Sequence, residues 1–195
     1  MWSAVLDVLE NINEDGICPE QRAMARSLMD KMQSYKFVFA MHLLRKIIGI
    51  TKVLSQPLQR KDQDIVNAMS LVGVVKRRLQ ALREMEWDAF LEKVKTFCVN
   101  NYITVPNMEE IIPTRGRPSR GGQTITHMHH FRMEVFCHVI DLIAQEMDRR
   151  FTEVSTELLL CIACLDPRNS FSAFNHAKLL RLAELYPEIF QQPIV

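Results

Sequence analysis

The stretch "IVNAMSLVGVVKRRLQALR", residues 65–83, decides the fold class. Its apolar side chains recur every three or four residues, the spacing of one face of an α-helix. These apolar residues are Ile65, Met69, Val72, Val75, Leu79 and Leu82. The other side is polar and basic, with Lys76, Arg77, Arg78, Gln80 and Arg83. The stretch therefore predicts an amphipathic helix with a basic outer stripe.

The same helical period runs through nearly all of the chain outside residues 101–126. Further helices are expected over 2–12, from Pro19, over 37–54, from Trp87 to Phe97, from about His129 to Met147, before Pro167, and between Asn175 and Pro187. The stripe of the helix that starts near His129 is expected to be Phe131, Val135, Val139, Leu142, Ile143 and Met147. No segment alternates apolar and polar residues as a half-buried strand does. We therefore predict an all-α, multi-helix bundle of about six to eight helices.

Prolines and glycines interrupt this pattern between residues 101 and 126. We expect one domain made of two helical halves, 1–100 and 127–195, joined by a loop over 101–126 that contains proline, glycine and arginine.

Composition sets limits on function. The chain has 195 residues, of which 48% are hydrophobic and 24% charged, so it can bury a core. Its net charge of +1 exerts no general attraction on nucleic acid. Five cysteines, an odd number, indicate reduced thiols in an intracellular protein of the nucleus or cytoplasm. The most apolar run, 37–50, contains charged residues and is shorter than the roughly 20 residues of a membrane span. No membrane partner is expected.

The segment "IIPTRGRPSRGG", 111–122, is the strongest candidate for a binding site. No acid occurs from Ile111 to Met133, whereas arginines are frequent. The string Arg115, Gly116, Arg117, Pro118 resembles an AT-hook, in which an extended strand enters the minor groove of A·T-rich DNA. Arg120 adds a further cation. Three interpretations remain open: an AT-hook, a set of general phosphate contacts, or a solvated linker.

Other motifs point to less specific chemistry. Cys161 and Cys164 form a C-x-x-C inside an apolar helix, without the further ligands that zinc needs, and are expected to be core residues. The "HMHH" cluster, 127–130, offers metal ligands or, more simply, the polar start of a helix. Trp87 lies at an apolar helix position, where it either packs in the core or stacks on a flipped base. No P-loop, nucleophile elbow or H-E-x-x-H is present. No catalytic residue, metal, cofactor or small-molecule substrate is expected.

Longer strings carry a family resemblance. They are "LSQPLQRKDQDIVNAMSLV" (54–72), "FRMEVFCHVIDLIAQEMDRRFTEVSTELLLCIACLDPRNSFSAFN" (131–175) and "KLLRLAELYP" (178–187), with "FVFAMHLLRKIIGIT" (37–51) in the same region. They resemble the middle of plant zinc finger MYM-type protein 1-like or TTF-type zinc-finger proteins, which derive from hAT-superfamily transposases. The resemblance covers most of the chain.

The resemblance implies a fold and a limited function. In such proteins a ribonuclease H-like catalytic domain is interrupted by a large helical insertion, and this chain is similar mainly to that insertion. The two family aspartates precede it, and the family glutamate follows it in a stretch like "ERAFS", which this chain lacks. No catalytic residue can be carried over. The resemblance implies a non-catalytic fragment or domesticated remnant with weak DNA or protein binding. The alternatives are one part of an active cut-and-paste transposase and a protein-interaction scaffold.

Overall fold

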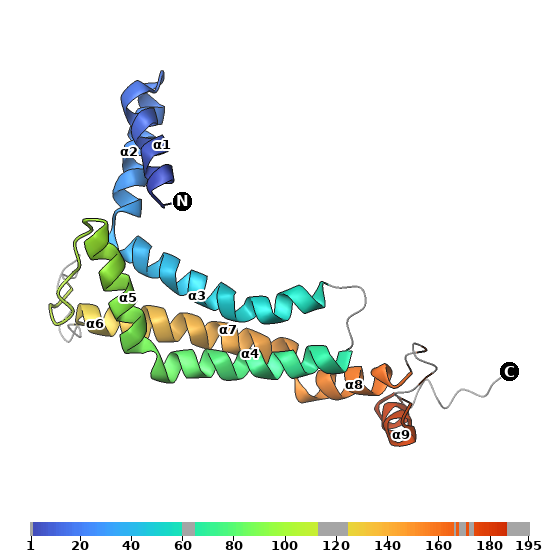
Figure 1. Ribbon diagram of the computed structural model, residues 1–195. Helices are drawn as coiled ribbons and strands as arrows, with labels where there is room; N and C mark the ends of the chain where they lie inside the picture. The colour runs from blue at the N-terminus through green and yellow to red at the C-terminus, as the bar shows by residue number, and fades with distance from the viewer. Residues whose placement is uncertain are drawn as a thin grey trace, which may run out of the picture. The chain divides into compact units, whose positions relative to one another are not determined.

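The computed structural model describes residues 2–59, 65–112, 125–165, 167, 171 and 174–186. Among these residues the fold is all-α, as predicted, with nine α-helices, one π-helix and no β-strand (Figure 1). α6, η1 and α7 follow one another without a break, so these elements form eight continuous helical segments, within the predicted number. No helix in the described ranges combines the length and apolarity needed to cross a membrane.

The helix bounds agree closely with the local sequence signals. The elements are α1 (Trp2–Asp15), α2 (Pro19–Met32), α3 (Tyr35–Leu58), α4 (Ile65–Met85), α5 (Trp87–Asn100), α6 (His127–His129), η1 (His130–Cys137), α7 (His138–Arg150), α8 (Glu153–Ala163) and α9 (His176–Leu185). Pro19 occupies the first turn of α2, where its missing N–H costs nothing. The Asn175 side chain caps α9 by accepting a hydrogen bond from the Lys178 N–H at 3.2 Å, as predicted. The predicted N-cap Asp62 and the stop at Pro187 lie outside the described residues.

Two compact units make up the chain, and each combines two separate stretches. Unit 1 contains residues 1–46 and 84–137, and unit 2 contains 47–83 and 138–195. Both α3 and α4 therefore contribute residues to each unit. The units have different bounds from the predicted halves at 1–100 and 127–195, and the division into those halves stays a prediction.

Aromatic side chains form the centre of unit 1. Phe39 is fully buried and meets Phe90 edge-to-face at a centroid distance of 5.2 Å and Phe131 at 4.9 Å. Trp87 and Phe90 each lie 5.1 Å from Phe136. Such pairs contribute about 0.5–1.5 kcal/mol each beyond the area they bury. The cluster therefore joins α3, α5 and η1.

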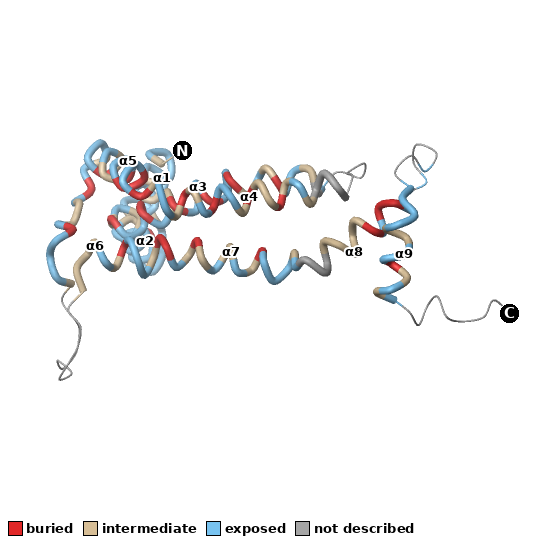
Figure 2. Tube along the Cα trace, turned by 90° about the horizontal axis from the view of Figure 1, so that it is seen from below, coloured by how far each residue is buried: buried red, intermediate tan, exposed pale blue. Residues whose placement is uncertain are grey.

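Within unit 2, the core face predicted for residues 65–83 is confirmed at four of its six positions. Val72, Val75, Leu79 and Leu82 are all buried on α4 (Figure 2). On the polar side, Lys76 pairs with Asp148 at 2.6 Å, and Arg83 donates two hydrogen bonds to Asp141. The two cations are seven residues apart on α4 and the two acids seven apart on α7. This equal spacing is that of an antiparallel helix pair, so two members of the basic stripe are neutralised by α7.

The π-helix η1 changes which side chains the following helix buries. An α-helical spacing predicts Val135 and Val139 after Phe131, but the structure fully buries Phe136 and Ile140 instead. A π-helix bonds residue i to i+5, so its face advances by one extra residue per turn. The predicted stripe is consequently wrong at Leu142, which is 51% exposed, and correct at Phe131 and Met147, which are buried.

Candidate functional site

The base of the basic segment is closed by backbone hydrogen bonds within unit 1. Ile111 and Thr126 form an antiparallel bridge, and the Ile112 N–H donates to the Ile125 carbonyl at 2.9 Å. Two further bonds run from the His127 N–H to the Glu110 carbonyl at 3.0 Å and from the Met128 N–H to the Met108 carbonyl at 2.8 Å. These backbone hydrogen bonds, here called the gate, hold residues 108–112 beside residues 125–128.

The predicted DNA-contact residues belong to the segment between these two points. They are Arg115, Gly116, Arg117, Pro118 and Arg120, and all five lie outside the described residues. Their role in binding DNA stays a prediction. Exposed Glu109 and Glu110 lie at the gate, so the described end of the segment carries negative charge.

The histidine cluster is the polar start of a helix in the described structure. Thr126 is the N-cap of α6, and its hydroxyl oxygen accepts a hydrogen bond from the His129 N–H at 3.2 Å. The His127 ring stacks on Phe131 with the two planes 17° apart. The His130 Nδ1 lies 2.6 Å from a carboxylate oxygen of Glu134. The rings of His127 and His130 therefore make local contacts at the start of this helix, whereas the contact of His129 is made by its backbone.

Trp87, the candidate base-stacking residue, begins α5 and is only 3% exposed. Its ring packs edge-on against Phe136 and at a tilt against Phe39, and the Arg132 guanidinium lies 5.8 Å from the ring centre. The guanidinium of Arg132 therefore covers one face of the Trp87 ring, and a base would need such a face for stacking. A base could therefore stack on Trp87 only after Arg132 and the aromatic neighbours had moved. The stacking role stays a prediction.

The end of α5 holds a feature that the sequence did not predict. The Ile103 N–H donates to the Cys98 carbonyl at 2.8 Å, and the Tyr102 N–H to the Val99 carbonyl at 3.2 Å. These two bonds make a Schellman motif, whose left-handed residue is usually glycine. Here it is Tyr102, with φ of 57° and a side chain that is 99% exposed. In the sequence, the pair Asn100-Asn101 just before Tyr102 indicated a helix end, because asparagine is common there.

A polar cavity of about 640 Å³ adjoins this turn. It is lined by Gln33, Ser34, Tyr35, Asn101, Tyr102, Ile103 and Thr104. Burial raises the pKa of the Tyr35 phenol and of the Cys98 thiol above their ordinary values, so both groups stay protonated at neutral pH. The Tyr35 hydroxyl is buried without a hydrogen-bond partner among the described residues. The Ser34 hydroxyl caps α3 by accepting a hydrogen bond from the Phe37 N–H at 3.3 Å. This polar group in the cavity wall therefore already stabilises the helix.

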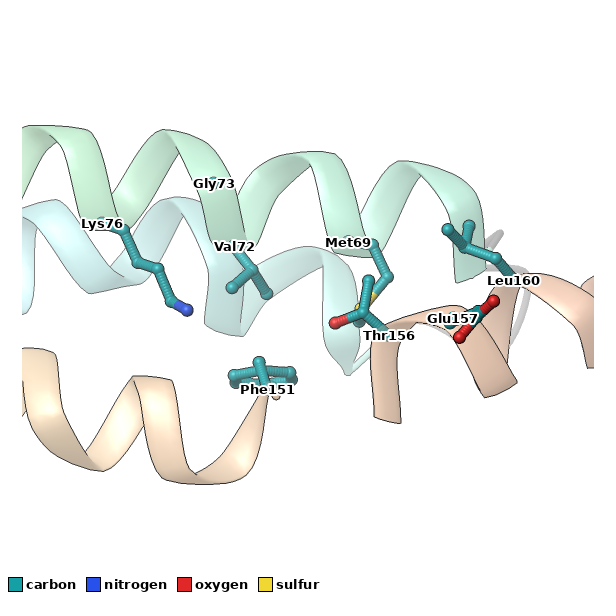
Figure 3. A pocket seen from close by; sticks show the side chains of 8 residues that line it. All are labelled: Met69, Val72, Gly73, Lys76, Phe151, Thr156, Glu157 and Leu160. Carbon is teal, nitrogen blue, oxygen red and sulfur yellow. The ribbon is translucent and has the colours of Figure 1, made fainter. Parts of the chain in front are cut away.

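A second cavity, of about 410 Å³, lies within unit 2 between α4 and α8 (Figure 3). Its walls are Met69, Val72, Gly73, Lys76, Phe151, Thr156, Glu157 and Leu160. Both charged residues in the wall already have ion partners, because Lys76 pairs with Asp148 and Glu157 pairs with Arg181 at 2.7 Å. The cavity therefore presents mainly apolar walls. The glycine inside the apolar helix pattern was the sequence signal for it, because glycine leaves space where a side chain would project.

The core placement predicted for Cys161 and Cys164 is confirmed, whereas Cys18 is only half-buried among the five cysteines. All five are unpaired, and Cys98, Cys137, Cys161 and Cys164 are buried. Among the described residues, no group of three His, Cys, Asp or Glu side chains is arranged to hold a metal ion.

No protein-family model, curated protein or solved structure matches the chain. The transposase resemblance therefore depends on the sequence strings alone.

Proposed function

We propose that this chain is a non-catalytic helical module derived from a hAT-type DNA transposase, and that it binds DNA weakly through residues 111–122. The observation that carries the proposal is the closed backbone gate at Ile111 and Thr126. The twelve residues between 112 and 125 include three arginines and no acid. A segment whose two ends are already held loses less conformational entropy on binding than a free tail of equal length. A module of this kind works in the nucleus.

Electrostatics set the expected strength of this contact. Three arginines that each neutralise one phosphate give a slope of about −2.7 for log affinity against log salt, at roughly 0.9 per contact. The net charge of +1 adds no general attraction, and Glu109 and Glu110 oppose binding near the gate. Binding is therefore weak at physiological salt. An AT-hook adds a preference for A·T tracts, whereas phosphate contacts alone add none.

A triple variant, Arg115→Ala, Arg117→Ala and Arg120→Ala, tests the DNA contact. The matched control is Lys36→Ala, Arg45→Ala and Lys93→Ala, which removes the same charge from exposed helix positions of unit 1. Both are titrated against A·T-rich and G·C-rich duplexes at two salt concentrations. We expect the loop variant alone to lose both the binding and the salt slope. Equal binding by the loop variant and the parent would leave the segment as a linker. The same samples incubated with Mg²⁺ should leave the duplex uncut, and cleavage would favour the active-transposase alternative.

Exposed apolar side chains favour a second function, a protein-interaction scaffold. On α1 and α2 they include Val5, Val8, Ile12, Met24 and Leu28, which are between 38% and 67% exposed. An apolar row of this kind on a soluble surface is typical of a binding face.

A further inference from the structure

The junction between α7 and α8 exposes a hydroxyl group close to two arginines. Thr152 lies between Arg150, the last residue of α7, and Glu153, the first residue of α8, and it is exposed. Its carbonyl oxygen accepts a hydrogen bond from the Thr156 N–H at 2.9 Å, so Thr152 occupies the N-cap position of α8. All of these residues belong to unit 2. The Thr152 side chain is therefore within reach of another protein.

The two arginines belong to the last turn of α7 and share one acid. The side chains of Arg149 and Arg150 are 72% and 66% exposed. Arg149 donates two hydrogen bonds to the Glu146 carboxylate, at 2.9 and 2.8 Å, and the Arg150 Nε donates a third at 2.6 Å. Two cations and one acid leave a local charge of +1. The end of α7 thus presents an exposed pair of guanidinium groups just before the Thr152 hydroxyl.

The spacing of these residues is a charge pattern that protein kinases read. Kinases choose their acceptors partly by the charges near the hydroxyl, and acids in the kinase groove bind arginines that precede it. Arg149 and Arg150 stand three and two residues before Thr152. Of all the serines and threonines in the sequence, Thr152 alone has arginine at both of these positions. The pattern therefore singles out one acceptor.

The last turn of α7 is free to open into such a groove. Met147 is buried, whereas Asp148, Arg149 and Arg150 after it are all exposed. Surface ion pairs such as that of Asp148 with Lys76 hold the side chains of this turn, and pairs of this kind contribute little stability. A helix end without buried side chains opens locally at small free-energy cost. Binding of this turn by a kinase therefore leaves the core of unit 2 in place.

We propose that Thr152 is a phosphorylation site for a protein kinase that reads Arg149 and Arg150, and that the phosphate then draws both arginines away from Glu146. In the transfer, the Thr152 hydroxyl oxygen bonds to the γ-phosphorus of ATP, its proton passes to a carboxylate of the kinase, and ADP leaves. This modification goes beyond the DNA contact and does not depend on it.

Electrostatics favour the exchange of partners. Phosphothreonine carries a charge of about −1.5 to −2 at neutral pH and three acceptor oxygens. Its attraction for a guanidinium exceeds that of the single negative charge of Glu146, and arginine binds phosphate through two parallel hydrogen bonds. The first turn of α8 also favours a negative charge at its N-cap. The phosphate therefore ties the end of α7 to the start of α8.

Peptide mapping by mass spectrometry tests the site, after the full chain has been incubated with ATP and a kinase that requires arginine at these two positions. We expect phosphate on Thr152 in the parent, and transfer slower by about tenfold or more in the Arg149→Ala, Arg150→Ala variant. The matched control is Arg77→Ala, Arg78→Ala, which removes an adjacent exposed arginine pair from α4 of the same unit and should leave the rate unchanged. Circular dichroism should be the same for all three proteins, because both pairs are exposed. Absence of phosphate on Thr152 in the parent, or equal rates in the two arginine variants, would overturn the proposed site.

The carboxyl group of Glu146 tests the exchange of partners. Hydrogen bonds from Arg149 and Arg150 hold its pKa at about 2 in the unmodified chain. Loss of these bonds to the phosphate should raise this pKa toward its ordinary value of 4.5. An NMR titration of the parent before and after phosphorylation measures the change, and the Arg149→Ala, Arg150→Ala variant supplies the value without arginines. A Glu146 pKa that phosphorylation leaves unchanged would refute the exchange.

Discussion

Replacing Tyr102 by glycine should stabilise the protein, although it removes the largest side chain in its turn. Tyr102 has φ of 57° and is 99% exposed, so the substitution relieves backbone strain without loss of packing. The left-handed conformation costs a residue with a Cβ roughly 1–2 kcal/mol. Glycine also gives the unfolded chain more conformational freedom, and this offsets about 0.5–1 kcal/mol of the stability gained. The net gain is about 0.5–1 kcal/mol, with both Schellman hydrogen bonds kept.

Tryptophan fluorescence is a selective assay for this change. The chain has two tryptophans, Trp2 and Trp87, and both belong to unit 1 together with Tyr102. For a chain of this size, a gain of about 0.5–1 kcal/mol raises the melting temperature by roughly 1–4 °C. Val99→Gly is the matched control, because Val99 is exposed within α5 and glycine there should destabilise by about 0.3–0.5 kcal/mol. If both glycine variants melt below the parent, strain at Tyr102 is not relieved and the reasoning fails.

Two further predictions concern ion pairs of unit 2. Asp141→Ala should destabilise by about 0.2–1 kcal/mol, because its partner Arg83 is only partly buried, and a double-mutant cycle with Arg83→Ala in chemical unfolding measures the coupling. Hydrogen bonds from Arg149 and Arg150 lower the pKa of exposed Glu146 from 4.5 to about 2. Because the folded-state pKa is the lower one, this contribution to stability is complete above about pH 4.5 and is lost as the pH falls toward 2. NMR titration of the Glu146 carboxyl should show the low pKa, and Glu146→Gln should remove this part of the acid dependence. A midpoint near 4.5 would contradict the pairing.

Helix bounds and most core positions could be predicted from the sequence because they depend on local periodicity and capping. The buried face of α4 and the cap at Asn175 are examples. The stripe after Phe131 could not be predicted, since the π-helical hydrogen bonding of η1 follows no residue pattern and shifts the face by one position. The contact of Arg132 with Trp87 could not be predicted either, because it joins residues 45 positions apart through tertiary packing.

The candidate site was predictable only in part for a similar reason. Charge and the absence of acids single out residues 111–122 directly from the sequence. The gate of hydrogen bonds between Glu110 and His127 depends on how the two ends of the segment approach each other. The strain at Tyr102 likewise depends on where α5 ends, and the sequence signals there favoured asparagine.

The interleaved order of the two units has a consequence for synthesis on the ribosome. Phe39 is made early, but three of its four aromatic neighbours, Phe90, Phe131 and Trp87, belong to the second stretch of unit 1. At about 5–20 residues per second, translation of residues 47–137 takes roughly 5–20 seconds. The apolar side of α3 that carries Val38, Phe39 and Leu43 is without its final partners throughout that interval, and unit 2 must wait still longer for residues 138–195. The nascent chain therefore exposes an apolar helix face early, and neither unit can complete its core before residue 137 has been made.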